Sequence, residues 1–145
     1  MATLEFESAM DELQKAFKSI ENVTDQVKID ALDSMAKVAK EKIRATGESM
    51  GVRDSESSVH ILDNITTTKA KLSKTGGYED ITFKGTRTRG KTKTRNAEIA
   101  FVNEYGKRGQ PARPFIGTAM SKNEKEIAEA GAEVLGDWIE KEFQK

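Results

Sequence analysis

The sequence contains no cysteine, one histidine and two prolines among its 145 residues. Without cysteine the chain can form no disulfide and no thiolate metal site, and such a chain fits a reducing compartment. Its only histidine, His60, would need several converging carboxylates to hold a metal, and it supplies no partner set for a nucleophile. The sequence therefore predicts no enzyme, no cofactor and no metal site, and His60 is interpreted as a structural or surface residue.

Long apolar runs are also missing. No stretch approaches the roughly 18 to 20 apolar residues of a membrane span. The first residues, MATLEFESAMDEL, are acidic and lack the basic start and apolar run of a secretory signal. We therefore expect a soluble protein made in the cytoplasm, with no membrane partner, folded as a single domain over residues 1–145.

Charge is balanced overall, with 24 basic and 24 acidic residues, but it is unevenly distributed. Residues 67–114 hold 12 Lys and Arg against 4 Asp and Glu, whereas the segments before and after them are net acidic. A basic middle between acidic ends predicts a polar contact surface, either for nucleic acid or for acidic patches on other copies of the chain.

Two amphipathic helices are predicted in the first third of the chain, because apolar residues recur there every three or four positions. Thr24 followed by Asp25 is a favourable start for the second helix, and Gly47 is expected to end it. The apolar positions are Phe6, Met10, Leu13, Phe17 and Ile20 in the first helix and Ile29, Leu32, Ala36, Ala39 and Ile43 in the second.

The rest of the chain predicts two strands and a third helix. Residues 57–65 fit either a short helical turn or the start of a strand. Apolar and polar residues alternate in 78–84 and in 97–103, which favours strands in both. A helix is expected from Pro114 almost to the C-terminus, with Ile127, Gly131, Val134, Leu135, Trp138 and Ile139 on one side. The fold class is α+β: two N-terminal helices and a long C-terminal helix packed on a small antiparallel sheet, with a long basic hairpin or loop.

Residues 85–92, GTRTRGKT, match the phosphate-binding pattern G-x-x-x-x-G-K-[ST]. A true P-loop follows a buried parallel strand and opens a buried helix, with Lys91 and Thr92 reaching phosphate and Mg²⁺. Here the preceding stretch is half polar, the following one is expected to be a strand, and the chain has no room for the usual sheet. We therefore interpret the match as a basic, glycine-punctuated hairpin and reject the NTPase interpretation.

The basic residues of this region have two interpretations. One is a solvated loop, and the other is a surface that faces phosphate or an acidic neighbour, where the attraction is independent of sequence and sensitive to salt. No recognition helix or zinc finger accompanies them, which argues against a sequence-specific DNA reader. The residues that would face DNA or an acidic partner are Lys84, Arg87, Arg89, Lys91, Lys93 and Arg95.

Residues 101–119, FVNEYGKRGQPARPFIGTA, are the most distinctive stretch and hold both prolines. Each proline favours extended geometry in the residue before it, and two glycines, Gly106 and Gly109, bracket a turn. The stretch therefore predicts a strand, a looped crossover and a helix whose start is fixed by Pro114 and anchored by Phe115. On these grounds alone it is a rigid connector.

The same stretch resembles a protein family. Glu104-Tyr105-Gly106 followed by a short basic loop and then by residues 111–115, Pro-Ala-Arg-Pro-Phe, is similar to the minor tail or head–tail joining (neck, tail-completion) proteins of long-tailed bacteriophages. The family is typified by the tenth gene product of a lambda-like coliphage. The order of elements and the length are also similar. One departure is that such proteins often have an Asp-Thr-Gly-type turn before their middle strands, to which residues 50–65 are only loosely similar.

The resemblance implies a structural virion component at the head–tail junction or tail end, as a neck, tail-completion or tail-terminator protein. It implies a homo-oligomeric ring, six-fold or a multiple, between connector or head-closure proteins and the tail tube or terminator, with double-stranded DNA passing through. The residues it assigns to oligomer or partner contacts are Glu104, Tyr105, Gly106, Pro111, Arg113, Pro114 and Phe115. Changes at Pro114 or Phe115 are accordingly expected to block assembly more than folding. The alternative is a small non-sequence-specific nucleic-acid-binding protein that uses residues 84–95.

Overall fold

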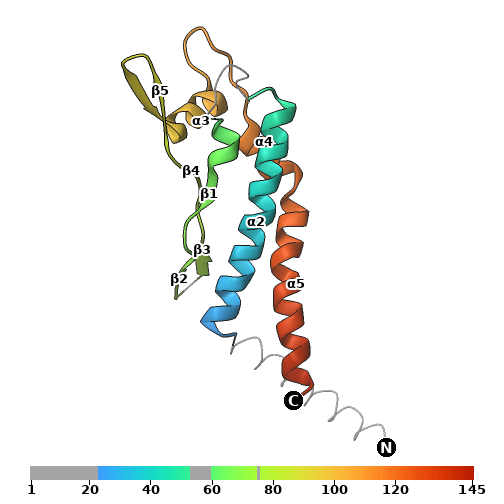
Figure 1. Ribbon diagram of the computed structural model, residues 1–145. Helices are drawn as coiled ribbons and strands as arrows, with labels where there is room; N and C mark the ends of the chain where they lie inside the picture. The colour runs from blue at the N-terminus through green and yellow to red at the C-terminus, as the bar shows by residue number, and fades with distance from the viewer. Residues whose placement is uncertain (1–22, 53–59, 75) are drawn as a thin grey trace, which may run out of the picture.

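The computed structural model describes residues 23–52, 60–74 and 76–145 (Figure 1). The first predicted helix, over residues 6–20, lies outside them. The described part combines helices with short antiparallel strands, which confirms the α+β class. In chain order the elements are α2 (Asp25–Ser49), the 3-10 helix η1 (Ile61–Asn64), β1 (Ile65–Thr67), β2 (Lys71–Ser73), β3 (Gly76–Tyr78), β4 (Ile81–Phe83), β5 (Thr86–Arg89), β6 (Thr92–Arg95), α3 (Asn96–Tyr105), α4 (Phe115–Lys122) and α5 (Glu124–Phe143).

The long helix α2 begins as predicted, because the Thr24 hydroxyl accepts a hydrogen bond of 3.3 Å from the backbone N–H of Val27. Its end is two residues later than expected. Gly47 lies inside the last turn and is buried, since a Cβ at this position would come within 2.6 Å of a Leu62 methyl carbon. Gly47 therefore serves close packing rather than helix termination, and Gly51, with φ of 71°, follows the end of the helix.

The C-terminal third forms two helices instead of the single helix that was predicted. The break is at Asn123, whose side-chain amide donates a 2.8 Å hydrogen bond to the Ala119 carbonyl. Both α4 and α5 run alongside α2 (Figure 1). Ile127 and Gly131 are buried on the inner side of α5, which confirms the side expected to face the core.

The strands form three separate two-stranded antiparallel sheets rather than one small sheet: β1 with β4, β2 with β3, and β5 with β6. The strand predicted around Ile81 and Phe83 is β4, and it pairs with β1 so that Ile65 lies opposite Phe83. Of the stretch 57–65, the structure describes residues 60–65, and these include both alternatives that the sequence allowed, because η1 leads directly into β1.

The second predicted strand, over residues 97–103, is wrong, because Asn96–Tyr105 is the helix α3. Ile99 and Phe101 do alternate, but burial follows the helical period: Ala100 and Asn103 are buried while Phe101 is 62% exposed. The inner face of α3 includes two asparagines, Asn96 and Asn103, so the apolar pattern alone could not reveal it.

The core lies where α2, η1, β1, β4, α3 and α4 converge. Phe115 at the start of α4 is fully buried, and its ring meets that of Phe83 edge to face with centroids 6.0 Å apart. Around this pair pack buried aliphatic residues from the other elements, so the start of α4 is anchored at the centre of the molecule. These residues are Ile43, Val52, Ile61, Leu62, Ile65, Ala100 and Ala119.

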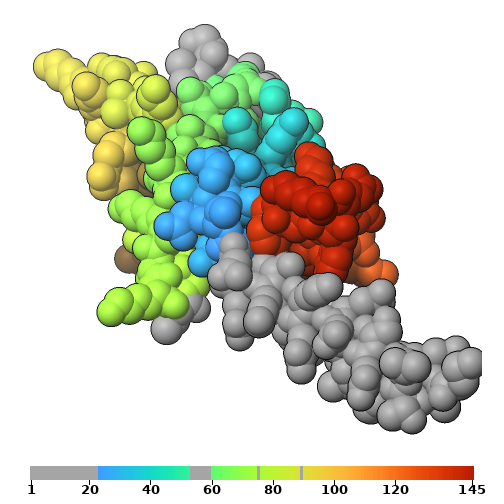
Figure 2. Space-filling view, turned by 90° about the horizontal axis from the view of Figure 1, so that it is seen from below, coloured from blue at the N-terminus to red at the C-terminus, as the bar shows by residue number. Residues whose placement is uncertain are grey.

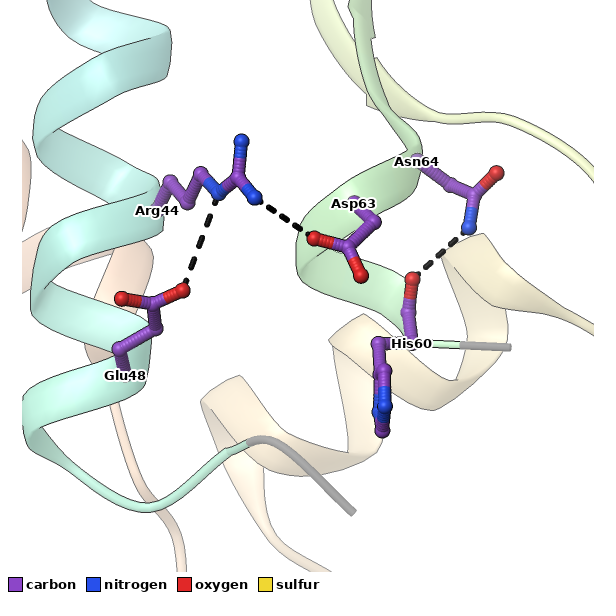
Figure 3. Close-up of polar contacts among 5 residues, drawn as sticks. All are labelled: Arg44, Glu48, His60, Asp63 and Asn64. Carbon is purple, nitrogen blue, oxygen red and sulfur yellow. Dashed lines mark hydrogen bonds and ion pairs between the residues drawn. The ribbon is translucent and has the colours of Figure 1, made fainter. Parts of the chain in front are cut away.

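A polar cluster joins α2 to η1 at the edge of this core (Figure 3). The Arg44 guanidinium lies 2.7 Å from an Asp63 carboxylate oxygen and 3.8 Å from that of Glu48. Next to it, the Asn64 side chain donates a 2.8 Å hydrogen bond to the His60 carbonyl. His60 thus begins η1 as a half-buried residue, in keeping with the structural role expected of it.

Seen along α2, the molecule has two sides (Figure 2). The residues of β5, β6 and α3 lie to one side of α2 and those of α5 to the other. None of the helices in the described ranges is long and apolar enough to cross a membrane.

Candidate functional site

Residues 85–95 form the basic hairpin that the sequence predicted. Strands β5 and β6 pair antiparallel and are joined by the two-residue turn Gly90-Lys91, where Gly90 has φ of 58°. Lys91 and Thr92 thus stand at the turn of a β-ribbon, whereas a P-loop would place them at the start of a helix. A helix does follow, contrary to the expectation for this stretch, but it begins only at Asn96, after β6.

The register of the hairpin separates its charges. Arg87 lies opposite Thr94, Lys93 opposite Thr88 and Arg95 opposite Thr86; position 89 is opposite Thr92. Directly opposed residues point to the same face, so Arg87 and Lys93 point to different faces of the ribbon. No two basic positions of these strands face each other directly, and both faces carry positive charge.

Five of the six basic residues named above have side chains that the structure describes, and these five occupy different environments. Lys84, Lys91 and Lys93 are exposed and form no ion pair with any residue that the structure describes. Arg95 forms an ion pair of 2.9 Å with Glu98 in the first turn of α3. Arg87 is half-buried beside α3 and has partners of its own. Among the described side chains, these three lysines present exposed charges that no ion pair neutralises.

A buried asparagine fixes the hairpin to α3. The side-chain amide of Asn96, which is fully buried, donates a 2.8 Å hydrogen bond to the Lys84 carbonyl, and its backbone N–H donates one of 3.0 Å to the Gly85 carbonyl. The root of the ribbon is thereby held at one point while its turn projects away from the helices (Figure 1).

Glu104, one of the residues that the resemblance assigns to contacts, caps the start of α4. Its two carboxylate oxygens accept hydrogen bonds from the backbone N–H groups of Ile116 and Gly117, at 2.8 and 2.9 Å. These are among the N–H groups that have no partner within a helix, and a negative charge is favourable at this end. Glu104 therefore joins the end of α3 to the start of α4.

Between these helices the chain makes a tight basic turn. Gly106 has φ of 76°, and a Cβ here would lie 2.9 Å from the backbone nitrogen of Ala112, so only glycine fits. Lys107 and Gln110 exchange two backbone hydrogen bonds of 3.0 and 2.9 Å. The turn thus projects Lys107 and Arg108 into solvent from a fixed base.

The last part of this stretch leads into the core. The Arg113 guanidinium donates a 2.7 Å hydrogen bond to the Gly51 carbonyl. Pro114, with φ of −75° and ψ of 67°, is the central residue of an inverse γ-turn, in which the Phe115 N–H donates a hydrogen bond to the Arg113 carbonyl at 2.7 Å. Because Phe115 is fully buried, it cannot be the contact residue that the resemblance suggested. Pro111 and Pro114 are exposed.

Tyr105 alone of the motif presents a large exposed apolar surface, and the structure adds a residue that the sequence analysis had placed on a strand. Phe101 and Tyr105 stand one turn apart on α3, 62% and 69% exposed, with ring centroids 4.8 Å apart at 48°. A helical assignment of residues 96–105 would have placed these two residues one turn apart. The alternation of Ile99 and Phe101 instead favoured a strand, so the pair was not predicted.

Two of the hollows on the described surface are lined by charged residues. The larger, of about 610 Å³, lies between β5, α3 and the 107–113 turn, and its charged lining residues are Arg87, Lys107, Arg113 and Glu98. The smaller, of about 410 Å³, includes Asp33 and Glu79.

Burial raises the pKa of the Glu79 carboxyl above its ordinary value of 4.5. The hydrogen bond and charge of Asp33 add to the rise, while hydrogen bonding to Thr67 opposes it. The described residues contain no group of three or more metal-binding side chains.

Comparison with protein families and with known proteins adds no relative. No family model matches the chain, and no curated protein and no solved structure does so either.

Proposed function

We propose that this protein is a non-enzymatic assembly component of a tailed bacteriophage or a related particle. In this role it forms a homo-oligomeric ring at the head–tail junction or tail end and joins the capsid connector to the tail. The proposal rests first on the similarity of residues 101–119 to the head–tail joining family.

One structural observation carries it further: Phe101 and Tyr105 form a pair of exposed aromatic rings in contact with each other, on a helix that lies between the basic hairpin and the basic 107–110 turn in the chain. Exposed apolar surface of this kind is typical of protein–protein contacts. It is held in place by the buried inner face of α3 and by the Glu104 cap on α4.

Electron microscopy of particles from a host that lacks this gene tests the proposal. DNA-filled heads separate from tails would support a joining role, and tails of uncontrolled length would support a terminator role. Normal, joined and infectious particles would contradict both. Re-expression of the wild-type chain should restore the particles, and re-expression with Phe101→Ser and Tyr105→Ser should not.

A second candidate, non-sequence-specific nucleic-acid binding, is favoured by the exposed Lys84, Lys91 and Lys93 on a projecting ribbon. Changing all three to serine should then weaken binding to double-stranded DNA strongly. The slope of log K against log salt should become shallower by about 0.9 for each phosphate that the variant no longer neutralises. Exposed lysines away from the ribbon, Lys122 and Lys125, provide the matched control. If the chain is chiefly a ring component, the free protein should bind DNA weakly and all variants should behave alike.

A further inference from the structure

The Phe101–Tyr105 pair is preorganised for contact. Ala100 and Asn103 are buried on the opposite side of α3. Within that helix the Asn103 side-chain amide donates a 2.9 Å hydrogen bond to the Ile99 carbonyl. The outer side of α3 continues the pair with the exposed Ala97, one turn earlier. Because the two rings already contact each other, a partner would bury them at a reduced cost in side-chain entropy.

The surroundings of the pair specify the charge of its partner. Residues 84–113 contain nine Lys and Arg against two Glu. Both glutamates are engaged, Glu98 by Arg95 and Glu104 by the start of α4. The exposed cations lie on the hairpin before α3 and on the turn after it. A partner should therefore present an acidic surface with room for two aromatic rings.

The outer side of α5 has this character. Helix α5 contains seven acidic residues and two lysines. Small exposed residues leave room between the acids, and a Cβ added at Gly136 would meet no atom within 4 Å. At about 1.5 Å per residue, twenty residues span about 30 Å, several times the length occupied by the aromatic pair. After the first turn of the helix, the exposed acids are Glu129, Glu133, Asp137 and Glu140, and the small residues are Ala128, Ala132 and Gly136.

We propose that Phe101 and Tyr105 of one copy pack on the outer side of α5 of a second copy, with the lysines of the hairpin and of the 107–110 turn opposite the acids of that helix. This inference rests on the proposed ring and names its interface. The two surfaces lie on opposite sides of α2 (Figure 2), so the contact is head-to-tail, and a pair of copies keeps one free surface of each kind for further neighbours. Such contacts generate a ring when the rotation closes.

Cysteine cross-linking tests the pairing directly, because the natural chain contains no cysteine. One protein carries Tyr105→Cys, and a second carries Cys at Ala128, Ala132 or Gly136, tested one at a time. Oxidation of the mixture should give a covalent dimer of twice the 16.0-kDa chain for at least one of the three positions. Tyr78→Cys, at a 53% exposed aromatic residue of β3, is the matched control and should not cross-link above background.

A complementation experiment tests the head-to-tail geometry. Phe101→Ser with Tyr105→Ser removes the aromatic surface, and Glu133→Lys with Asp137→Lys reverses the acidic one. Each aromatic change should weaken association at least about tenfold, and each double variant should sediment as a monomer at a concentration where the wild-type chain is oligomeric. An equimolar mixture should form a dimer, because one intact surface of each kind remains. Unchanged circular dichroism melting would show that the variants are folded.

Three results would overturn the inference: a wild-type chain that stays monomeric at millimolar concentration, cross-linking no greater than the Tyr78→Cys control, or efficient self-cross-linking of Tyr105→Cys. Oligomers that resist both double variants would overturn it as well while leaving the proposed function intact. The proposed function fails separately, if particles lacking the protein are normal.

Discussion

The helices around Phe115 and the projecting ribbon with α3 are neighbours in the chain, yet they differ in how far their large side chains are buried within the molecule. Around Phe115 every contact is internal: its ring is fully buried, and Phe83, Ile43 and Leu62 surround it. In the ribbon and α3, by contrast, the rings of Phe101 and Tyr105 contact each other but face solvent, and the lysines of the ribbon are exposed.

The comparison shows that a short sequence motif can divide between two tasks. Within residues 104–115, Glu104, Gly106 and Phe115 maintain the fold, whereas Tyr105 points outward. Adjacent residues of one helix thus serve stability and contact because a helix turns by about 100° per residue. Changes at Glu104, Gly106 or Phe115 should consequently destabilise the fold, whereas changes at Tyr105 should block assembly.

The largest effect is expected at the centre of the core. Phe115→Ala should lower the free energy of unfolding by about 3 to 5 kcal/mol, since it removes a fully buried ring and leaves a cavity. Urea denaturation followed by circular dichroism would measure the loss. Phe101→Ala, at an exposed ring, should change stability by less than about 1 kcal/mol. Equal losses in the two variants would remove the distinction between the inner and outer regions.

Gly106→Ala should lower the free energy of unfolding by about 2 to 3 kcal/mol, because it combines a positive φ with a Cβ placed 2.9 Å from the Ala112 nitrogen. Gly109 has a similar φ of 80° but open space around it. Gly109→Ala should therefore cost only about 1 kcal/mol. Thermal melts of the two variants separate steric from conformational cost, and a larger loss at Gly109 would contradict the geometry of the turn.

Glu104→Ala should lower stability by about 1 to 2 kcal/mol, because two backbone N–H groups of α4 lose their acceptor. Glu104→Gln retains one oxygen and should lose less. The matched control is Glu98→Ala, which removes only an exposed ion pair with Arg95 and should cost a few tenths of a kcal/mol. The denaturant midpoints of the three variants would rank their losses of stability. A larger loss for Glu98→Ala than for Glu104→Ala would show that the cap contributes little to stability.

The smallest effect concerns pH. Since the pKa of Glu79 is raised in the folded state, this group stabilises the protein fully below its ordinary pKa of 4.5, and that contribution is lost as pH rises through the folded value. Glu79→Gln should thus melt at a slightly higher temperature than wild type at neutral pH, and the difference should shrink on acidification. Parallel melting curves at all pH values would indicate that Asp33 and burial do not perturb this carboxyl. Glu140→Gln, on exposed α5, serves as control.

Much of the helical framework was predictable from local signals. The cap at Thr24 and the regular spacing of apolar residues identified α2, and the same spacing identified the inner side of α5. The basic hairpin followed from alternating threonine and cations around Gly90. These features depend on residues close together in the chain, which is why a pattern reveals them.

The contacts between distant elements were not predictable. Glu104 finds its partners 12 and 13 residues later, and Arg113 bonds to a carbonyl 62 residues earlier. The helix α3 was mistaken for a strand because its inner face is partly polar, with Asn96 and Asn103 buried. Because residues 97–103 were expected to form a strand, the sequence did not predict that Phe101 and Tyr105 would lie side by side on a helix.

The two-residue turn of the hairpin has a consequence for how charge is presented. With Gly90-Lys91 as the turn, odd-numbered cations pair with even-numbered threonines, so the ribbon is electrostatically similar on both faces. A slip of one strand by one residue past the other would shift this parity and place cations opposite cations on one face and threonines on the other. The ribbon would then become amphipathic without any change in its sequence. Strand register, which the turn fixes, is therefore the variable by which a protein with this hairpin can change a two-sided polycation into a one-sided one.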